Sequence, residues 1–492
     1  MQSLAKWMRM TCPAAAAAGG GAARCSAASP SAFQPWICGS MAQDKPWSYH
    51  KTSRRLPAGG GDRRSRSPPA ATAVMMNEAA ATAVGVSPTA AAIMPPASTV
   101  YHPPQLRLYS IAPMMDWTDN YFRTLARLMT RCAWLYTEMV VAETIVHQAD
   151  NLGRFLDFDE FQHPIVLQIG GNDPGNLAKA AQLAGPYGYD EINLNCGCPS
   201  EKVVDRGCFG ASLMLNPVLV GQAMAAIAES CTVPVTVKCR IGVDNFDSYE
   251  ELYTFVSTVA AMSPTKHFII HARKAILKGL SPSENRNIPP LKYEYVYALI
   301  RDFPELKFTL NGGVISLPQA QNALQMGAYG VMIGRAAYNS SWSTLGSIDS
   351  VIYGEKDPGL TRRQIVEKYA AYADARCGKY GPKRPNIRTL MKPLLHLFHA
   401  EQGASTWRRA VDEALSVKKL MTVKSILEET LKVIPDSVLD AAPPPPENLP
   451  DPFLYQMGPL PERPVRFESL PKTIAFSNDL LQRTEELEAA CS

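Results

Sequence analysis

Between residues 106 and 336 the sequence alternates short strand-like runs with helix-like segments, and this alternation constrains the fold more than any other feature. The runs are rich in β-branched or aromatic residues, and they cover 108–112, 135–140, 164–170, 191–197, 234–240, 267–273, 307–313 and 330–336. Strands that alternate with helices are typical of parallel βαβ units. Eight such units predict an α/β fold of the (β/α)8 TIM-barrel type. A doubly wound sheet is the alternative, but it favours a Gly-rich first turn, which Ile111–Met115 lacks.

The pattern changes to helical periodicity beyond the last strand-like run. We expect the barrel over residues 105–345 and a helical domain over residues 360–436. Its helices are expected over 362–375, 386–400 and 407–433. Residues 361–436 carry fifteen Lys and Arg against eight Asp and Glu, and basic and aromatic residues are interleaved at Lys379–Arg384 and Trp407–Arg409. This composition favours RNA binding, although a solvated helical surface is the simpler alternative.

The two ends of the chain differ in composition from its middle. The first hundred residues carry ten Lys and Arg against three Asp and Glu, and residues 1–43 are rich in Ala, Ser, Gly and Arg and contain no acid. This composition is typical of an organelle transit peptide, so we expect residues 1–100 to form a disordered extension that directs the protein to a chloroplast or mitochondrion. A disordered extension without a targeting function, in a cytoplasmic protein, is the alternative. Residues 437–492 begin with a Pro-rich stretch and are expected to form an extended tail.

Several classes of protein are disfavoured by composition. No apolar run approaches the roughly 18 residues that a membrane-spanning helix needs. The chain has 11 cysteines, but they are irregularly spaced and include no CxxC pair, so neither a disulfide framework nor a metal site is expected.

A cysteine follows the fourth strand-like run directly. The stretch Asp190–Ser200 leads from that run into Cys198, which stands between Gly197 and Pro199. Barrel enzymes keep their catalytic residues at the carboxyl ends of strands. Glycine permits a close approach of the backbone to a ligand and proline stiffens the turn, so Cys198 is the candidate catalytic residue. A small buried thiol without a catalytic role is the alternative.

Lys238 interrupts the fifth strand-like run, 234–240, and should point into the barrel mouth if the alternation holds. A buried ammonium group persists only beside an anion or an electron-rich polar ring. A reduced flavin, which carries negative charge at the N1 and O2 edge of its ring, is such a partner. A lysine at the edge that reaches solvent is the alternative.

The last two strand-like runs end in glycines. These ends read Asn311-Gly312-Gly313 and Gly334-Arg335. In TIM barrels a phosphate site is often built by the loops after strands seven and eight. Glycines let backbone N–H groups face an anion, and an arginine can bind it through a bidentate fork, so a phosphate site is favoured over simple turns.

Residues from about 106 to 434 resemble the tRNA-dihydrouridine synthases, and specifically the subfamily that modifies positions 20 and 20a of the tRNA D-loop. The resemblance rests on the segments Ile111–Asp119, Leu135–Met139, His163–Gln168, Gly188–Asn195, Gly197–Ser200 and Ile269–Ala275. The segments particular to that subfamily are Gly279–Pro282, Glu284–Arg286 and Ile288–Leu291. Position 283 is Ser where members of the subfamily often have a basic residue, which puts one tRNA contact in doubt.

The resemblance implies an FMN-dependent TIM barrel followed by a helical tRNA-binding domain, an enzyme that uses NADPH to reduce uridine in tRNA to 5,6-dihydrouridine. It implies that hydride passes from FMN to C6 of uracil and that Cys198 protonates C5. The residues that the resemblance assigns to FMN are Pro113, Met114, Met115, Gln168, Lys238, His271, Asn311, Gly312, Gly313, Gly334 and Arg335.

The candidate tRNA contacts are Asn195 and Arg240 for the everted base and Arg286, Arg388 and Lys392 for the RNA backbone. Two other functions compete with this prediction. A dihydroorotate dehydrogenase shares the fold and the lysine, but it would not need a basic helical domain. An RNA-binding protein without redox function would not need Cys198, Lys238 and His271.

Overall fold

The computed structural model describes residues 106–200, 203, 209–381, 384–418, 421–446 and 457–464. The expected extension over residues 1–100, with its organelle transit peptide, lies outside the described residues, and so does most of the expected tail over residues 437–492. Within the described part of the chain, no helix combines the length and the apolar character that crossing a membrane requires.

Nine strands in the described part of the chain form one parallel sheet. They are β1 (Tyr109–Ile111), β2 (Trp134–Tyr136), β3 (Val140–Val141), β4 (Ile165–Gly170), β5 (Glu191–Cys196), β6 (Val235–Arg240), β7 (His267–His271), β8 (Lys307–Asn311) and β9 (Gly330–Ile333). Their order is β2-β1-β9-β8-β7-β6-β5-β4-β3, and a further pairing of β2 with β4 closes the sheet. The closed eight-strand parallel barrel confirms the predicted TIM-barrel fold, with β3 as a short extra strand on β4.

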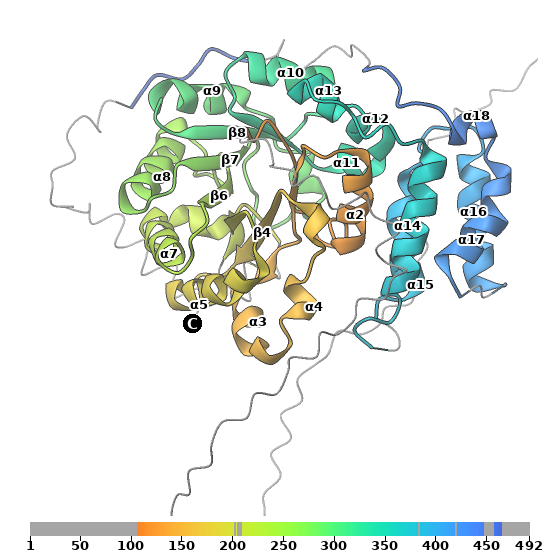
Figure 1. Ribbon diagram of the computed structural model, residues 1–492. Helices are drawn as coiled ribbons and strands as arrows, with labels where there is room; N and C mark the ends of the chain where they lie inside the picture. The colour runs from red at the N-terminus through yellow and green to blue at the C-terminus, as the bar shows by residue number, and fades with distance from the viewer. Residues whose placement is uncertain are drawn as a thin grey trace, which may run out of the picture. The chain divides into compact units, whose positions relative to one another are not determined.

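Helices follow the strands and surround the barrel (Figure 1). They are α2 (Asn120–Met129), α3 (Ala142–His147), α4 (Gly153–Leu156), α5 (Pro174–Ala184), α7 (Pro217–Glu229), α8 (Tyr249–Met262), α9 (Tyr293–Asp302), α10 (Leu317–Gln325), α11 (Arg335–Asn339), α12 (Ser341–Leu345) and α13 (Ile348–Tyr353). A side-chain N-cap begins several of them. Asp119 caps α2, Asp173 caps α5 and Ser248 caps α8, each contributing about 1 kcal/mol to helix stability.

The run 135–140, which was expected to be one strand, is divided between β2 and β3. The Thr137 hydroxyl accepts a hydrogen bond from the backbone N–H of Gln168 at 3.0 Å and donates one to the carbonyl of Glu138 at 2.8 Å. A side chain therefore takes the place of a backbone acceptor at this point, and the strand ladder is interrupted there.

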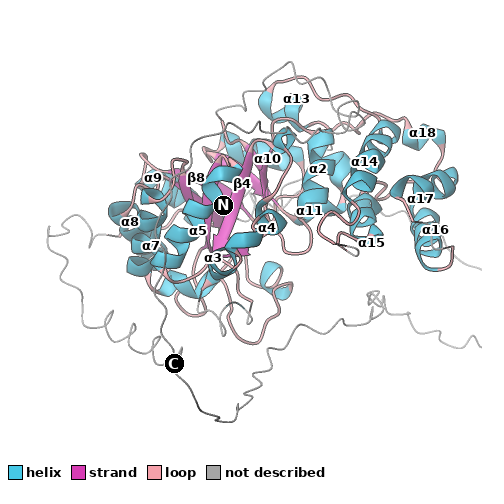
Figure 2. Ribbon diagram, turned by 60° about the horizontal axis from the view of Figure 1, so that its bottom comes forward, coloured by secondary structure: helices cyan, strands magenta, loops and turns pink. Residues whose placement is uncertain are grey.

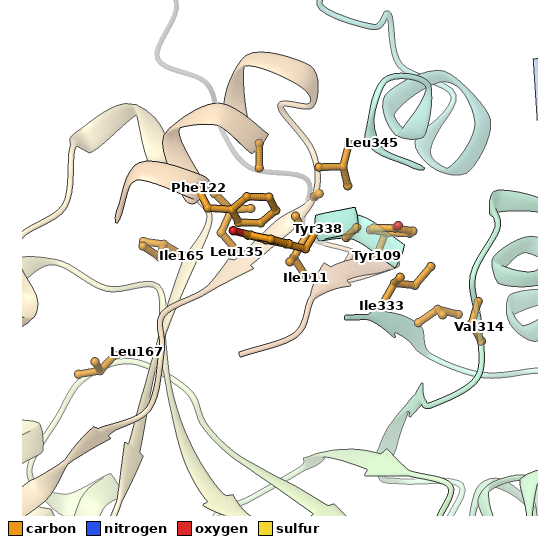
Figure 3. Close-up of a cluster of buried hydrophobic side chains, with 14 of the residues drawn as sticks. Tyr109, Ile111, Phe122, Leu135, Ile165, Leu167, Val314, Ile333, Tyr338 and Leu345 are labelled. Atoms are coloured by element: carbon orange, nitrogen blue, oxygen red, sulfur yellow. The ribbon is translucent and has the colours of Figure 1, made fainter. Parts of the chain in front are cut away.

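Strand residues alternate between the barrel interior and the layer beneath the helices. Leu135 shares a hydrophobic cluster with Phe122 of α2 and Tyr338 of α11, so it faces the helices (Figure 3). Its neighbours Trp134 and Tyr136 belong to a second, smaller cluster on the other face, together with Ala112, Val166, Ile269 and Met332. The second cluster fills part of the barrel interior.

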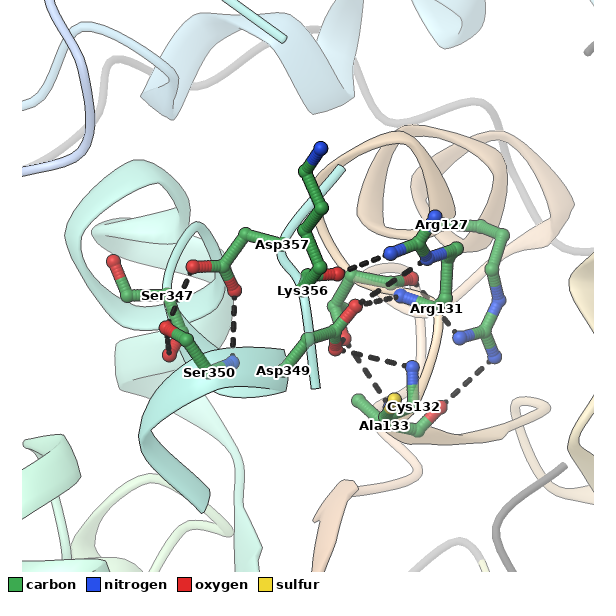
Figure 4. A network of polar contacts seen from close by, with 10 residues as sticks. Arg127, Arg131, Cys132, Ala133, Ser347, Asp349, Ser350, Lys356 and Asp357 are labelled. Atoms are coloured by element: carbon green, nitrogen blue, oxygen red, sulfur yellow. Dashed lines mark hydrogen bonds and ion pairs between the residues drawn. The ribbon is translucent and has the colours of Figure 1, made fainter. Parts of the chain in front are cut away.

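A buried carboxylate joins the end of α2 to α13 (Figure 4). Asp349 is fully buried, and its oxygens accept hydrogen bonds from the backbone N–H groups of Arg131 at 2.8 Å and Cys132 at 3.1 Å and from the Thr130 hydroxyl. These bonds satisfy backbone donors where the chain leaves α2 for β2. They lie at the opposite end of the barrel from the carboxyl ends of the strands.

The helical domain packs on α2 of the barrel. Its elements are α14 (Arg362–Arg376), α15 (Ile387–Met391), the 3-10 helix Lys392–His396, α16 (Ala404–Ser416), α17 (Val423–Thr430) and α18 (Asp436–Leu439), which Figure 2 shows next to one another. The single helix expected over 407–433 is two helices, because Thr422 caps a new helix by accepting from the backbone N–H of Ser425 at 3.0 Å. Trp407 is fully buried in the core of this domain, so it is not available to stack on RNA.

Candidate active site

The parallel register places the predicted residues of neighbouring strands at the same rim. Asn195 on β5 lies beside Lys238 on β6, and Arg240 on β6 lies beside His271 on β7. His271 in turn lies beside Asn311, the last residue of β8. Since all the strands run in one direction, residues far apart in the sequence meet at the carboxyl-terminal edge of the barrel, where barrel enzymes hold their substrates.

The turn that carries Cys198 is held by side chains from two strands. The Oδ1 atom of Asn195 accepts hydrogen bonds from the backbone N–H groups of Gly197 at 2.9 Å and Cys198 at 3.0 Å, while Nε of Arg240 donates to the Gly197 carbonyl at 2.9 Å. Gly210 packs against this turn with φ +75°, and a Cβ there would lie 2.6 Å from the Cys198 carbonyl oxygen. The half-buried thiol is therefore presented on a rigid turn.

Lys238 carries an ammonium group inside this rim. Burial and, to a lesser degree, neighbouring Arg240 lower the pKa of Lys238 to about 8, whereas Cys239 and Cys198 act in the opposite direction. Within the described part of the chain the ammonium group has neither a hydrogen-bond nor an ion-pair partner. A cation held in this way fits an anionic or electron-rich group of a ligand.

His271 is a neutral imidazole. Burial holds its pKa well below the ordinary range, and the surrounding cations Arg240, Lys238, Arg273 and Arg286 lower it further. A neutral ring keeps one N–H donor and one acceptor nitrogen, so it suits hydrogen bonding to a polar ligand rather than charge pairing.

The end of β8 forms a cradle of backbone N–H groups. Gly312 and Gly313 have φ values of +103° and +79°, in the left-handed region that favours glycine. A Cβ on Gly312 would lie 2.5 Å from Cδ2 of His271, so this position admits no side chain. Among the described residues, the backbone N–H group of Gly313 meets no backbone acceptor outside the strand ladder. Unpaired N–H groups beside cations fit a phosphate, so these residues suit a ligand that carries both a phosphate and an electron-rich ring.

Asn311 and Arg335 have partners within the protein. Asn311 donates to the carbonyl of Met332 at 2.8 Å and so ties β8 to β9. The exposed Arg335 guanidinium donates to Oδ1 of Asn287 at 2.8 Å and to the Arg286 carbonyl at 3.3 Å. Arg335 thus orders the loop after β7 as well as adding positive charge to the rim.

The loop after β1 completes the rim next to β9. Pro113 and Met114 are half-buried, whereas Met115 is 62% exposed. Gly334 lies against this loop, since a Cβ on it would be 3.4 Å from Sδ of Met114. The three residues therefore present an apolar surface at the rim, next to the predicted phosphate cradle.

Gln168 is buried, and its amide is already engaged. Its Nε2 donates to Oδ1 of Asn193 at 2.8 Å, and its Oε1 accepts from Nδ2 of Asn195 at 3.0 Å. The amide that was predicted to face the cofactor thus links β4 to the strand that carries Cys198.

Three of the five candidate tRNA contacts lie near Cys198, and two do not. Arg240 is buried and donates to the carbonyls of Lys274 at 2.9 Å and Asn285 at 3.0 Å, in addition to Gly197. Arg335 donates to the Arg286 carbonyl at 3.3 Å, and burial and Arg335 lower the pKa of Arg286 while Cys198 acts in the opposite direction. Asn195, Arg240 and Arg286 therefore belong to the rim.

Arg388 and Lys392 belong to the helical domain. Arg388 pairs with Asp412 at 3.3 Å and donates to the Ser416 hydroxyl at 2.6 Å. Lys392 donates to the carbonyl of Asp116, on the loop that carries Met115. Each of these predicted RNA contacts thus has a partner within the protein.

The structure adds two carboxylic acids that sequence reasoning did not single out. Burial and, to a lesser degree, neighbouring Asp119 raise the pKa of Glu138, just after β2, to about 7. Burial likewise raises the pKa of Asp119 to about 6. The position of Glu138 at a strand end was the available signal. No group of His, Cys, Asp and Glu in the described part of the chain could hold a metal ion.

Comparison with known proteins gives matches that span the barrel and the helical domain. The family model "Dihydrouridine synthase (Dus)" matches residues 110–434, which span the barrel and the helical domain. A tRNA-dihydrouridine(20/20a) synthase of Shewanella oneidensis is 46% identical over 307 residues, which cover 62% of this chain and 88% of that protein. The protein of the same name from Escherichia coli K12 is 44% identical over 330 residues, covering 67% and 92%.

A solved old yellow enzyme homologue from Zymomonas mobilis is 11% identical with a TM-score of 0.35, covering 48% of this chain and 86% of that one, and this likeness is too weak to carry an argument. The family match and the identity to the bacterial proteins do support an assignment to a family, because they extend over both the barrel rim and the helical domain. On these grounds the chain belongs to the dihydrouridine synthase family.

Proposed function

We propose that this enzyme reduces uridine at positions 20 and 20a of the tRNA D-loop to 5,6-dihydrouridine, with FMN as its flavin and NADPH as the reductant. The observation that carries the proposal is the rim itself, where the braced Cys198 thiol lies among cations that have no carboxylate partner in the described part of the chain. The bacterial proteins that are 44% to 46% identical bear the name of this activity.

The rim residues fit FMN in three ways. The glycine turn Gly312–Gly313, with the N–H group of Gly313 and the positive charge of Arg335, suits its phosphate. Lys238 and the neutral His271 suit the polar edge of the isoalloxazine ring. The half-buried Met114 suits an apolar face of that ring. When bound, FMN supplies to C6 of uracil a hydride that originates from NADPH.

Cys198 then acts as the general acid. Addition of hydride at C6 moves the electrons of the C5–C6 double bond toward C5 and the C4 carbonyl, and the S–H proton of Cys198 passes to C5. The thiolate left behind lies on the turn that Arg240 braces, beside the strand that carries Lys238. Proton donation from a positioned group contributes roughly 10²–10⁴-fold to a rate.

The target base must leave its stack to reach this rim, because uridine 20 belongs to a folded tRNA. Arg286 lies on the loop after β7 that Arg335 orders, and its charge acts on Cys198, so we assign it the RNA backbone next to the everted base. Exposed basic residues of the helical domain provide further contacts with the tRNA body.

The test is a reaction of the purified full-length protein with tRNA that lacks dihydrouridine. The flavin that the protein carries is released and identified by mass, and dihydrouridine is mapped by position after addition of NADPH. FMN and new dihydrouridine at positions 20 and 20a are the expected results. A different flavin, or reduction at another position, would contradict the proposed assignment, and NADH as the only effective donor would contradict the choice of reductant.

A further inference from the structure

A chain of buried side chains runs through the barrel interior to the Cys198 turn. The Thr236 hydroxyl donates to Oε1 of Glu191 at 2.6 Å, and Nδ2 of Asn193 donates to Oγ1 of Thr236 at 2.9 Å. Gln168 donates to Asn193 at 2.8 Å, and Asn195 donates to Gln168 at 3.0 Å. The chain links β4, β5 and β6 and ends at the oxygen of Asn195 that holds the backbone N–H groups of the turn.

Every hydrogen bond in this chain points in the same direction, away from the turn and toward Glu191. Glu191 forms an ion pair with Arg107, and the resulting carboxylate can only accept hydrogen bonds. Thr236 must therefore donate to it, which leaves the hydroxyl oxygen to accept from Asn193. The same requirement passes along the amides, so that Asn193 presents its oxygen to Gln168 and Gln168 presents its oxygen to Asn195.

The last amide in the chain decides how the turn is held. Asn195 can accept from two backbone N–H groups only if its oxygen faces them, and a reversed amide would oppose N–H to N–H. Glu191, Asn193, Thr236 and Gln168 are each at most 1% exposed, so water cannot compensate for a wrong orientation. The carboxylate at the far end of the chain thereby fixes the orientation of an amide beside the thiol.

We propose that Glu191, Thr236, Asn193 and Gln168 are positioning residues that act through Asn195 to hold the Cys198 turn in the geometry for proton transfer. This inference rests on the proposed function for its catalytic consequence, although the restraint on the turn does not depend on which substrate is reduced. Arg240, which holds the Gly197 carbonyl, braces the same turn independently from β6.

Thr236→Val tests the proposal far from the thiol. It replaces the hydroxyl with a methyl group of similar size and so cuts the chain two amides before Asn195. We expect flavin reoxidation by unmodified tRNA to slow by about tenfold, the change that follows from a loss of roughly 1.4 kcal/mol. Flavin content and the rate of flavin reduction by NADPH should stay as in the unmodified enzyme, because the residues assigned to the cofactor phosphate are untouched.

Thr309→Val is the matched control. Thr309 on β8 is also buried in the barrel, and its hydroxyl lies 2.7 Å from Nε2 of His267. His267 contacts Arg107 on the far side of Glu191, so removing this hydroxyl leaves every hydrogen bond between Glu191 and Asn195 in place. It should lower stability without slowing reoxidation by tRNA. Equal slowing by both variants, or slowing by neither, would overturn the proposal.

A second readout does not need activity. We expect the alkylation rate of Cys198 by iodoacetamide, measured on its own peptide by mass spectrometry, to change at least threefold in Thr236→Val and not in Thr309→Val. Adding Thr236→Val to Asn195→Ala should have no further effect, because residues in one chain are not additive. A full additional effect in the double variant would overturn the proposal. An alkylation difference in a protein that reduces no uridine would leave the restraint standing and contradict only the proposed function.

Discussion

The barrel rim and the helical domain are both rich in Lys and Arg, but they use these charges differently. At the rim, Lys238, Arg240, Arg273, Arg286 and Arg335 form no ion pair within the described part of the chain. In the helical domain most cations have an acidic partner, as Arg362 does with Glu401 and Lys418 with Glu429. Further pairs dock this domain on the barrel, where Arg376 pairs with Asp159 and Lys379 with Asp157.

The difference shows why a net charge is a poor guide to a binding surface. Paired cations hold a fold together, and their field is largely cancelled at the distance of a ligand. Unpaired and partly buried cations persist because a ligand supplies the missing negative charge. The rim therefore has the clearer features of an anion-binding site, although the helical domain has the more basic sequence.

Removing the thiol should have the largest effect at the rim. In Cys198→Ala we expect dihydrouridine formation to fall by roughly 10²–10⁴-fold, because this variant removes the proton donor that we assign to C5. Flavin binding should be retained. The matched control is Cys377→Ala, which removes an exposed thiol at the end of α14. Equal activity in Cys198→Ala and Cys377→Ala would show that Cys198 is not the proton donor.

Neutralising the rim lysine should have the next largest effect. Lys238→Gln should weaken flavin binding by about tenfold or more, since a partly buried cation without an ion-pair partner in the described residues is removed from the site. The pKa of Lys238 is about 8, so the charged form that attracts an anion is lost as pH rises above 8. The flavin affinity of the unmodified protein should therefore fall as the pH rises above 8. The fall should extend to higher pH, because a bound anion raises the pKa of Lys238.

In Lys238→Gln this pH dependence should be absent. Lys307→Gln serves as the control, because Lys307 begins β8 at the opposite end of the barrel and is exposed. The measurement is flavin affinity by fluorescence quenching from pH 7 to pH 10. The same slope in all three proteins would show that another group titrates.

Substitutions in the helical domain should have smaller effects on tRNA binding. The effect of each should depend on whether the substituted residue has an ion-pair partner. Arg408 and Arg409 are exposed and form no ion pair within the described residues, whereas Arg388 pairs with Asp412. Replacing Arg408 and Arg409 with Ala should weaken tRNA binding severalfold and reduce its salt dependence. Arg388→Ala and Lys392→Ala should each weaken it less. The reverse order in a titration at several salt concentrations would show that pairing does not govern these contacts.

The smallest effect is expected from ion pairs that only hold the helical domain against the barrel. Asp159→Asn should lower the free energy of unfolding by about 1 kcal/mol, because it removes the half-buried pair with Arg376 and weakens the hydrogen bond from Tyr372. Arg363→Ala, which removes solvent-screened pairs with Asp436 and Asp440, should change it by less. Urea unfolding measures both, and a larger loss in Arg363→Ala would reverse this ranking.

The barrel and its rim were predictable because they depend on local patterns. Period-two alternation identifies strands, and parallel strands necessarily bring their carboxyl ends together, so Cys198, Lys238 and His271 could be placed at one edge from the sequence. The helical domain was predicted less well. The break between α16 and α17 depends on the Thr422 cap, and the pairing of Arg388 depends on which helix faces which.

The buried chain from Glu191 to Asn195 was also beyond sequence reasoning. Its members come from three strands, and polar residues at interior positions can equally well bind a ligand or each other. Gln168 and Asn195 were assigned to ligands from the resemblance, and the hydrogen bonds between them exist only once the strand register is fixed. Side-chain partners across distant elements are a property of packing, which local sequence does not encode.

The most direct test of the central claim is rapid-mixing absorption spectroscopy of the flavin in the full-length protein. NADPH should bleach the flavin band, and anaerobic addition of tRNA that lacks dihydrouridine should restore it together with one dihydrouridine per flavin turned over. Cys198→Ala should be bleached at the same rate and restored far more slowly. A flavin that free uracil or orotate restores as fast as tRNA does, or a protein that binds tRNA but carries no flavin, would contradict the account.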